Sequence, residues 1–142
     1  MKAALLAKHA QHIVLIHFPI ALFVAAVGFD FLARITRKPA FSTVAYYNVL
    51  VAAIMCVPVL ISGILAWRFQ LQGQPLKGLL RQHLLLGVTS TCLIWLTWWF
   101  HRRAIRAPDS QVPINRLALE LIAAACVVLT AHMGGFLSGV NM

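Results

Sequence analysis

The chain has little charge and very few acidic residues. Of its 142 residues 11% are charged, and only three are Asp or Glu. Soluble domains are usually about 25% charged and about 45–50% apolar, whereas 61% of this chain is hydrophobic and its mean hydropathy is +0.85. A chain this short has too much surface for its volume to hide so many apolar side chains in one core. The composition therefore excludes a soluble globule, and it equally excludes a disordered chain.

Other features are scarce as well. The three cysteines, Cys56, Cys92 and Cys126, are too few and too far apart for a disulfide framework. No nucleophile–base pair, phosphate-binding loop or pair of neighbouring carboxylates is recognisable, so we do not expect a stand-alone enzyme. The 12 Lys and Arg residues give a net charge of +9, but they lie near the ends of apolar segments and form no basic stripe. They suit anchoring at lipid headgroups and not nucleic-acid binding.

What the chain does have is four uncharged, continuously apolar stretches of 20 to 29 residues. About 20 apolar residues are enough for a helix to cross the hydrocarbon core of a bilayer. We therefore predict an all-α integral membrane protein, one domain over residues 1–142, folded as an up-down-up-down four-helix bundle. The expected helices span residues 12–34, 43–67, 80–101 and 115–138.

This topology defines two membrane faces. Face A carries both termini and the 68–80 loop, and face B carries the 34–42 and 102–114 loops. Five cations fall on face A and seven on face B, so the positive-inside rule places face B in the cytoplasm and the termini outside. We expect the first helix to stay in the mature protein, because His12, His17 and Pro19 interrupt a run that would otherwise suit a signal peptide.

The six histidines outnumber the carboxylates two to one. Imidazoles in hydrocarbon must find a partner or a metal, because an unsatisfied polar group there is costly. We expect His9 to be solvated at the interface and His101 to belong to the face-B anchor. Five of the six belong to the face-A half of three helices: His9, His12, His17, His83 and His132.

The face-A half offers imidazoles and neither carboxylates nor exposed thiolates. Such a ligand set suits heme iron, copper or zinc. Heme b fits best, as one or two hemes. On depth His17 and His132 are the preferred axial pair and His12 with His83 the next, and the sequence leaves the pairing open.

Other residues at this end favour a heme. Gly63, Gly134 and Gly135 would let a macrocycle pass close to the backbone, although small residues also serve helix packing. Arg68 and Arg81 are placed to hold propionates, or else to act as snorkelling anchors.

The carboxylates belong to face B. Asp30 precedes Arg34 by four residues and Glu120 follows Arg116 by four, so both are expected to form ion pairs within their own helices. A proton-relay role is the alternative for either carboxylate, because ionisable groups inside membrane spans are often functional.

Several motifs together resemble a known family. His12, His17, Phe18 and Pro19 form a His-x4-His-Phe-Pro pattern that Asp30 follows on the same helix. With Ser62-Gly63, His83 and the double glycine after His132, the pattern resembles small bacterial four-helix proteins known only as predicted membrane proteins of unknown function. Members occur fused to or beside c-type cytochrome domains, which implies redox or respiratory work in the bacterial inner membrane.

We therefore expect a membrane b-type cytochrome, or a heme-bearing subunit of a respiratory assembly. It would pass electrons between quinone and an outer-face c-type cytochrome or dehydrogenase subunit, as part of a homo- or hetero-oligomer. Two other functions stay open: a copper or zinc site for metal handling, and a cofactor-free scaffold whose histidines only hydrogen-bond between helices.

Overall fold

The computed structural model describes residues 8–69, 71–104 and 112–138. The described part contains four long helices and confirms the expected all-α architecture. Their ends differ from the predicted ones by at most four residues. The helices are α2 (Lys8–Thr36), α3 (Pro39–Phe69), α4 (Gly78–Ala104) and α5 (Ile114–Leu137).

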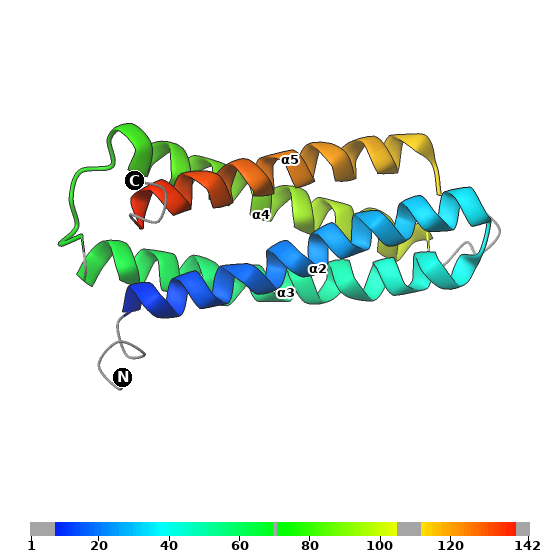
Figure 1. The fold of residues 1–142 in the computed structure, drawn as a ribbon, viewed down its shortest axis with the longest axis horizontal. Helices are drawn as coiled ribbons and strands as arrows, with labels where there is room; N and C mark the ends of the chain where they lie inside the picture. Colours follow the sequence, from blue (N-terminus) through cyan, green and yellow to red (C-terminus); the bar gives the residue numbers. More distant parts are fainter. Residues whose placement is uncertain (1–7, 70, 105–111, 139–142) are drawn as a thin grey trace.

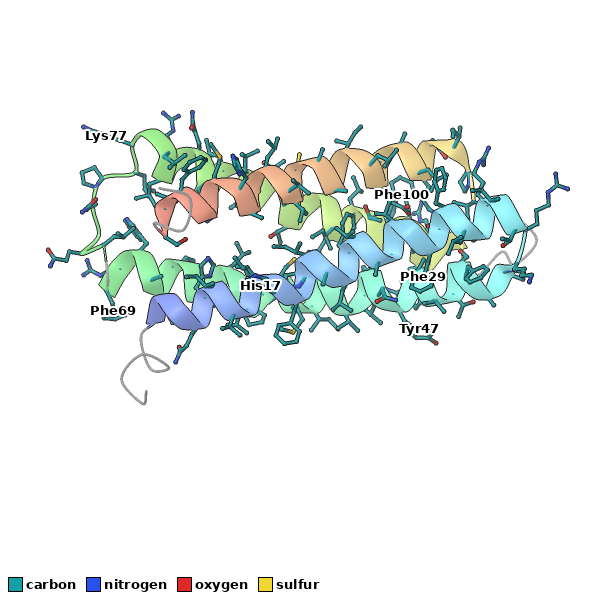
Figure 2. All side chains as sticks on the ribbon, in the orientation of Figure 1. His17, Phe29, Tyr47, Phe69, Lys77 and Phe100 are labelled. Atoms are coloured by element: carbon teal, nitrogen blue, oxygen red, sulfur yellow. The ribbon has the colours of Figure 1, made fainter. Side chains whose placement is uncertain are left out.

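Each helix is long and apolar enough to cross a membrane. Lengths of 24 to 31 residues correspond to about 36–46 Å at 1.5 Å per residue, which exceeds the hydrocarbon thickness of about 30 Å. At most 28% of the most apolar window of any helix is buried inside the protein. Apolar side chains such as Val14 are exposed, and the aromatic side chain of Tyr47 projects outward from the ribbon (Figure 2). The chain is therefore a multi-pass membrane protein whose outer surface faces lipid.

The bundle consists of two helical hairpins, α2–α3 and α4–α5. Arg37 and Lys38 alone join α2 to α3, and Arg37 takes a left-handed φ of 56° to make this tight reversal. Helix α3 packs against α2 and α4, and α5 packs against α4 and α2. Therefore α2 lies diagonally opposite α4, and α3 lies diagonally opposite α5. Figure 1 shows the start of α2 and the end of α5 at one end of the bundle, which is face A.

Small side chains let the first hairpin pack closely. Ala45, Ala52, Ala53 and Cys56 form a buried stripe on α3 that contacts the buried Phe23 of α2. Small residues allow helix backbones in a membrane to approach, where van der Waals contact replaces the hydrophobic effect. Cys56 is thus a core residue of the first hairpin.

Candidate functional site

His12 packs against the second helix of its own hairpin. Its Nδ1 lies 2.9 Å from Ser62 Oγ, and the Ser62 hydroxyl already donates its hydrogen to Val59 O. The His12 Nδ1–H is therefore the donor, and the lone pair of the neutral ring is on Nε2. A Cβ on Gly63 would lie 3.1 Å from His12 Cε1, so the absence of a side chain at Gly63 makes room for the imidazole.

His83 repeats this arrangement in the second hairpin. Its Nδ1 lies 3.1 Å from Thr130 O on α5, and because a carbonyl only accepts, Nδ1–H is again the donor. A Cβ on Gly134 would lie 3.1 Å from His83 Cε1. Both half-buried histidines thus sit over a glycine of the neighbouring helix, in the tautomer that leaves the lone pair on Nε2.

The two histidines occupy corresponding positions on their helices. Asp30 follows His12 by 18 residues on α2, and His101 follows His83 by 18 residues on α4. Eighteen residues are five turns of an α-helix, about 27 Å, so each pair shares one face of its helix. Asp30 and His101 meet in the bundle interior, 3.1 Å apart. By helical phase, His12 and His83, five turns earlier, lie on the same faces of α2 and α4 as Asp30 and His101.

The pair that depth alone favoured does not face the interior. His17 is exposed on the side of α2, and its Nδ1–H donates to Ile13 O of its own helix. His132 is also exposed and packs edge-on against Phe136, with 4.8 Å between the ring centroids. The structure therefore does not bring His17 and His132 together inside the bundle. The depth of a residue in the membrane follows from its position along the helix, whereas the side to which it points depends on its rotation about the helix axis.

The supporting residues lie at face A. Arg68 and Arg81 are exposed there, in the last turn of α3 and the first turn of α4. Gly135 is half-buried beside Gly134. The side chain of His9 lies outside the described part of the chain.

A zinc site takes three or more protein ligands around one ion, and His12, His17, His83 and His132 form no such group in the described part of the chain. Among the described residues, only one group of three or more His, Cys, Asp or Glu side chains lies close enough to share a metal, and it contains none of His12, His17, His83 and His132. That group is at face B.

The face-B cluster consists of Asp30, His101, Arg116 and Glu120. His101 Nε2 lies 2.8 Å from Glu120 Oε1 and 3.1 Å from Asp30 Oδ2. Arg116 Nη2 lies 2.7 Å from the same Asp30 oxygen and donates to Ser42 Oγ at 3.1 Å, and Arg116 Nε lies 3.6 Å from Glu120 Oε1. At most 5% of any of these four side chains is exposed, so the cluster ties three helices together inside the membrane protein.

Two expectations are corrected here. Asp30 does not pair with Arg34: the Arg34 guanidinium donates to Val112 O at 2.6 Å, and Asp30 contacts Arg116 and His101 instead. His101 is not a surface anchor, since it is 1% exposed. The expected contact between Glu120 and Arg116 is present. The signal that could have found the cluster is the equal 18-residue spacing from His12 to Asp30 and from His83 to His101.

A cavity of about 490 Å³ lies at the same end, between α4 and α5. Phe100 and Leu96 give it apolar walls, and Arg103 and Asn115 add polar groups. Arg116 belongs both to the lining of this cavity and to the face-B cluster.

Comparison with known proteins supports the membrane assignment. The model of the family described as "Predicted membrane protein (DUF2231)" matches residues 8–140, which is nearly the whole chain. The chain belongs to the DUF2231 family. No curated protein and no solved structure shows a significant match to it.

The DUF2231 description says only that the protein lies in a membrane, so its chemistry has to be inferred from the side chains. This DUF2231 chain carries two polar centres five turns apart. At face A two imidazoles each lie over a glycine of a neighbouring helix, and at face B two carboxylates, an imidazole and a guanidinium lie together. Soft or borderline metals suit the first set, and exchangeable protons or hard cations suit the second.

Proposed function

We propose that this protein is a membrane b-type cytochrome that binds a single heme between His12 and His83 and serves as an electron-transfer subunit. The observation that carries the proposal is the matched pair of histidine–glycine contacts at corresponding positions of diagonally opposite helices. Heme iron with two imidazole ligands needs this kind of opposed pair. When bound, the heme would supply one-electron transfer through its iron.

The donor set and its surroundings fit a heme. Axial histidines normally donate Nδ1–H to a carbonyl or hydroxyl oxygen, which fixes the ring and leaves Nε2 for the metal. His12 and His83 each have the Nδ1 hydrogen bond of this arrangement, with Ser62 and Thr130 as the acceptors. The carboxylates of the described residues, Asp30 and Glu120, lie at face B, and a donor set of imidazoles without them is typical of b-type heme sites.

The glycines provide space beside the proposed ligands. At Gly63 and Gly134 any larger residue would meet a histidine ring at about 3.1 Å, closer than ordinary van der Waals contact. The two glycines would therefore let each imidazole lie close against the neighbouring helix, with the macrocycle between the two rings. Arg68 and Arg81, exposed at the same face, would pair with the propionates.

The redox partners follow from the location of the site. A heme near face A lies within reach of a carrier at that membrane surface, so a c-type cytochrome or a dehydrogenase subunit is the proposed partner on that side. Quinone is the proposed lipid-soluble partner. The outward, lipid-exposed faces of all four helices leave room for further subunits or a second copy of the chain.

The test is the spectrum of the purified protein. We expect a Soret band, and separate α and β bands in the reduced-minus-oxidised spectrum. The pyridine hemochrome assay should give one heme per chain. His12→Ala and His83→Ala should each abolish heme binding, because one iron needs both imidazoles. His17→Ala and His132→Ala are the matched controls, since each removes an exposed histidine from the same helix or hairpin.

Three results would contradict the proposal. Purified protein without porphyrin but with stoichiometric copper or zinc would favour metal handling. Protein without any cofactor, together with folded His12 and His83 variants, would favour a scaffold. Two hemes per chain, with half lost in each single variant, would replace the shared site by two separate ones.

A further inference from the structure

The face-B cluster contains charged groups that electron transfer at face A does not use. We propose that Asp30, His101 and Glu120, held by Arg116, form a binding site for one exchangeable proton. The site lies at the opposite end of the bundle from His12 and His83, so it does not depend on the proposed heme.

Charge balance is the first reason. The two carboxylates carry two negative charges, and Arg116 supplies one positive charge, which leaves a deficit of one inside a low-dielectric region. Buried charge is tolerated only when it is compensated. A single proton makes the cluster neutral, whereas a divalent cation would leave it at +1 with the Arg116 guanidinium 2.7 Å from one of its ligands.

Geometry shows where the proton would be shared. One ligand atom from each of the two carboxylates and the imidazole lies within 4.8 Å of the others. His101 Nε2 contacts both carboxylates, so a proton on this nitrogen is within hydrogen-bonding distance of either acceptor. The proton can therefore pass between His101 and a carboxylate without any movement of the backbone.

Unpartnered oxygens are the second, independent observation. Asp30 Oδ1 and Glu120 Oε2 are buried and have no hydrogen-bond partner among the described residues. Thr97 Oγ1, one turn before His101 on α4, is fully buried and lacks a partner in the same part of the chain. Buried acceptors without donors are rare, and they mark places where a proton or a water binds.

The charged surroundings set the direction of access. Asp30 and Glu120 are each six residues from the face-B end of their helix, about 9 Å deep. The membrane interior beyond them is apolar, so protons would enter from face B. Among the described residues of this half, the other charged or titratable groups are Arg34 on α2, Arg37 and Lys38 between α2 and α3, Tyr46 and Tyr47 on α3, and Cys92, Arg102 and Arg103 on α4.

Glu120 is the only glutamate in the chain, which allows a test without substitution. The wild-type protein, labelled with 13C-carboxyl glutamate and reconstituted in lipid nanodiscs, is titrated while infrared spectra record the carboxylic-acid C=O band. A parallel sample with 15N-labelled histidine reports the His101 ring by NMR. We expect one protonation event to which both labels respond at the same pH.

Variants then separate coupling from coincidence. His101→Gln is expected to shift the midpoint of the Glu120 titration by more than about one pH unit, a tenfold change in proton affinity. His17→Gln, which removes an exposed imidazole, should leave the midpoint unchanged. If His101→Gln does not fold, the wild-type titration of the two labels still decides the question.

Two results would overturn the proposal. In one, neither label changes its protonation state over the pH range in which circular dichroism shows intact helices, so that the cluster is a fixed ion-pair network. In the other, the wild-type protein binds stoichiometric Mn²⁺ or Zn²⁺ and loses it in Glu120→Gln, so that the site is a metal site. Neither result bears on whether heme binds at face A.

Discussion

The Arg116 guanidinium is the permanent positive charge of the face-B cluster, and we expect its removal to lower the free energy of unfolding strongly. Arg116→Met keeps a side chain of similar length but leaves Asp30 without its contact at 2.7 Å and Ser42 without its donor at 3.1 Å. Arg116 is 5% exposed and Asp30 is fully buried. Removing one partner of such a buried pair costs about 3–5 kcal/mol, because the other charge stays buried and uncompensated.

Arg103→Met is the matched control. Arg103 is an exposed arginine of the same membrane face whose guanidinium lies 3.6 Å from the centre of the Trp99 ring. An exposed cation–π contact is worth about 0.5–1 kcal/mol. Reversible unfolding by SDS in mixed micelles, followed by far-ultraviolet circular dichroism, should therefore place Arg116→Met about 2 kcal/mol or more below Arg103→Met in free energy of unfolding.

A double-mutant cycle tests the cause. Asp30→Asn removes the charge that Arg116→Met leaves uncompensated, so the double variant should be more stable than the sum of the two single effects predicts, by about 1–3 kcal/mol. Equal stability of the Arg116 and Arg103 variants, or strict additivity of the Arg116 and Asp30 changes, would refute the view that Arg116 stabilises the helix packing through this ion pair.

The remaining predictions concern the heme cradle and the topology. Gly134→Val should lower the heme content several-fold, because its Cβ would lie 3.1 Å from His83 Cε1. Gly28→Val should leave the heme content unchanged, because a Cβ at Gly28 would have no neighbouring atom within 4 Å. Heme absorbance per chain measures both variants, and equal losses would contradict a role of Gly134 in heme binding. In a background without native cysteines, Gln74→Cys should react with an impermeant maleimide from the outer face and Lys38→Cys only from the cytoplasmic face. Labelling of both from one side would contradict the topology.

The four helices were predictable because a membrane span is a property of consecutive residues. Twenty uncharged apolar residues are enough to identify it, and the observed ends follow to within a few residues. The side of each helix that faces the protein was not predictable in the same way. Lipid tails and the bundle interior are both apolar, so hydropathy does not separate an exposed His17 from a half-buried His12.

The face-B cluster was missed for a related reason. Local rules paired Asp30 with Arg34, four residues away, whereas the structure pairs it with Arg116, 86 residues away. No rule based on spacing within one helix can find such a partner. The spacing in the two hairpins could have suggested the contact between Asp30 and His101, since His12 to Asp30 and His83 to His101 span the same five turns.

This spacing also decides how strongly the two centres can influence each other. They are about 27 Å apart, and at an effective dielectric constant of about 20 two unit charges at that separation interact by about 0.6 kcal/mol. That energy moves a titration midpoint by less than about half a pH unit. A change of charge on a face-A heme would thus leave the proton occupancy at Asp30, His101 and Glu120 nearly unaltered through the electric field alone. Tight coupling of electron and proton binding would require the hairpins to move. Such a movement would have to break contacts between them, among them the ion pair between Asp30 of α2 and Arg116 of α5.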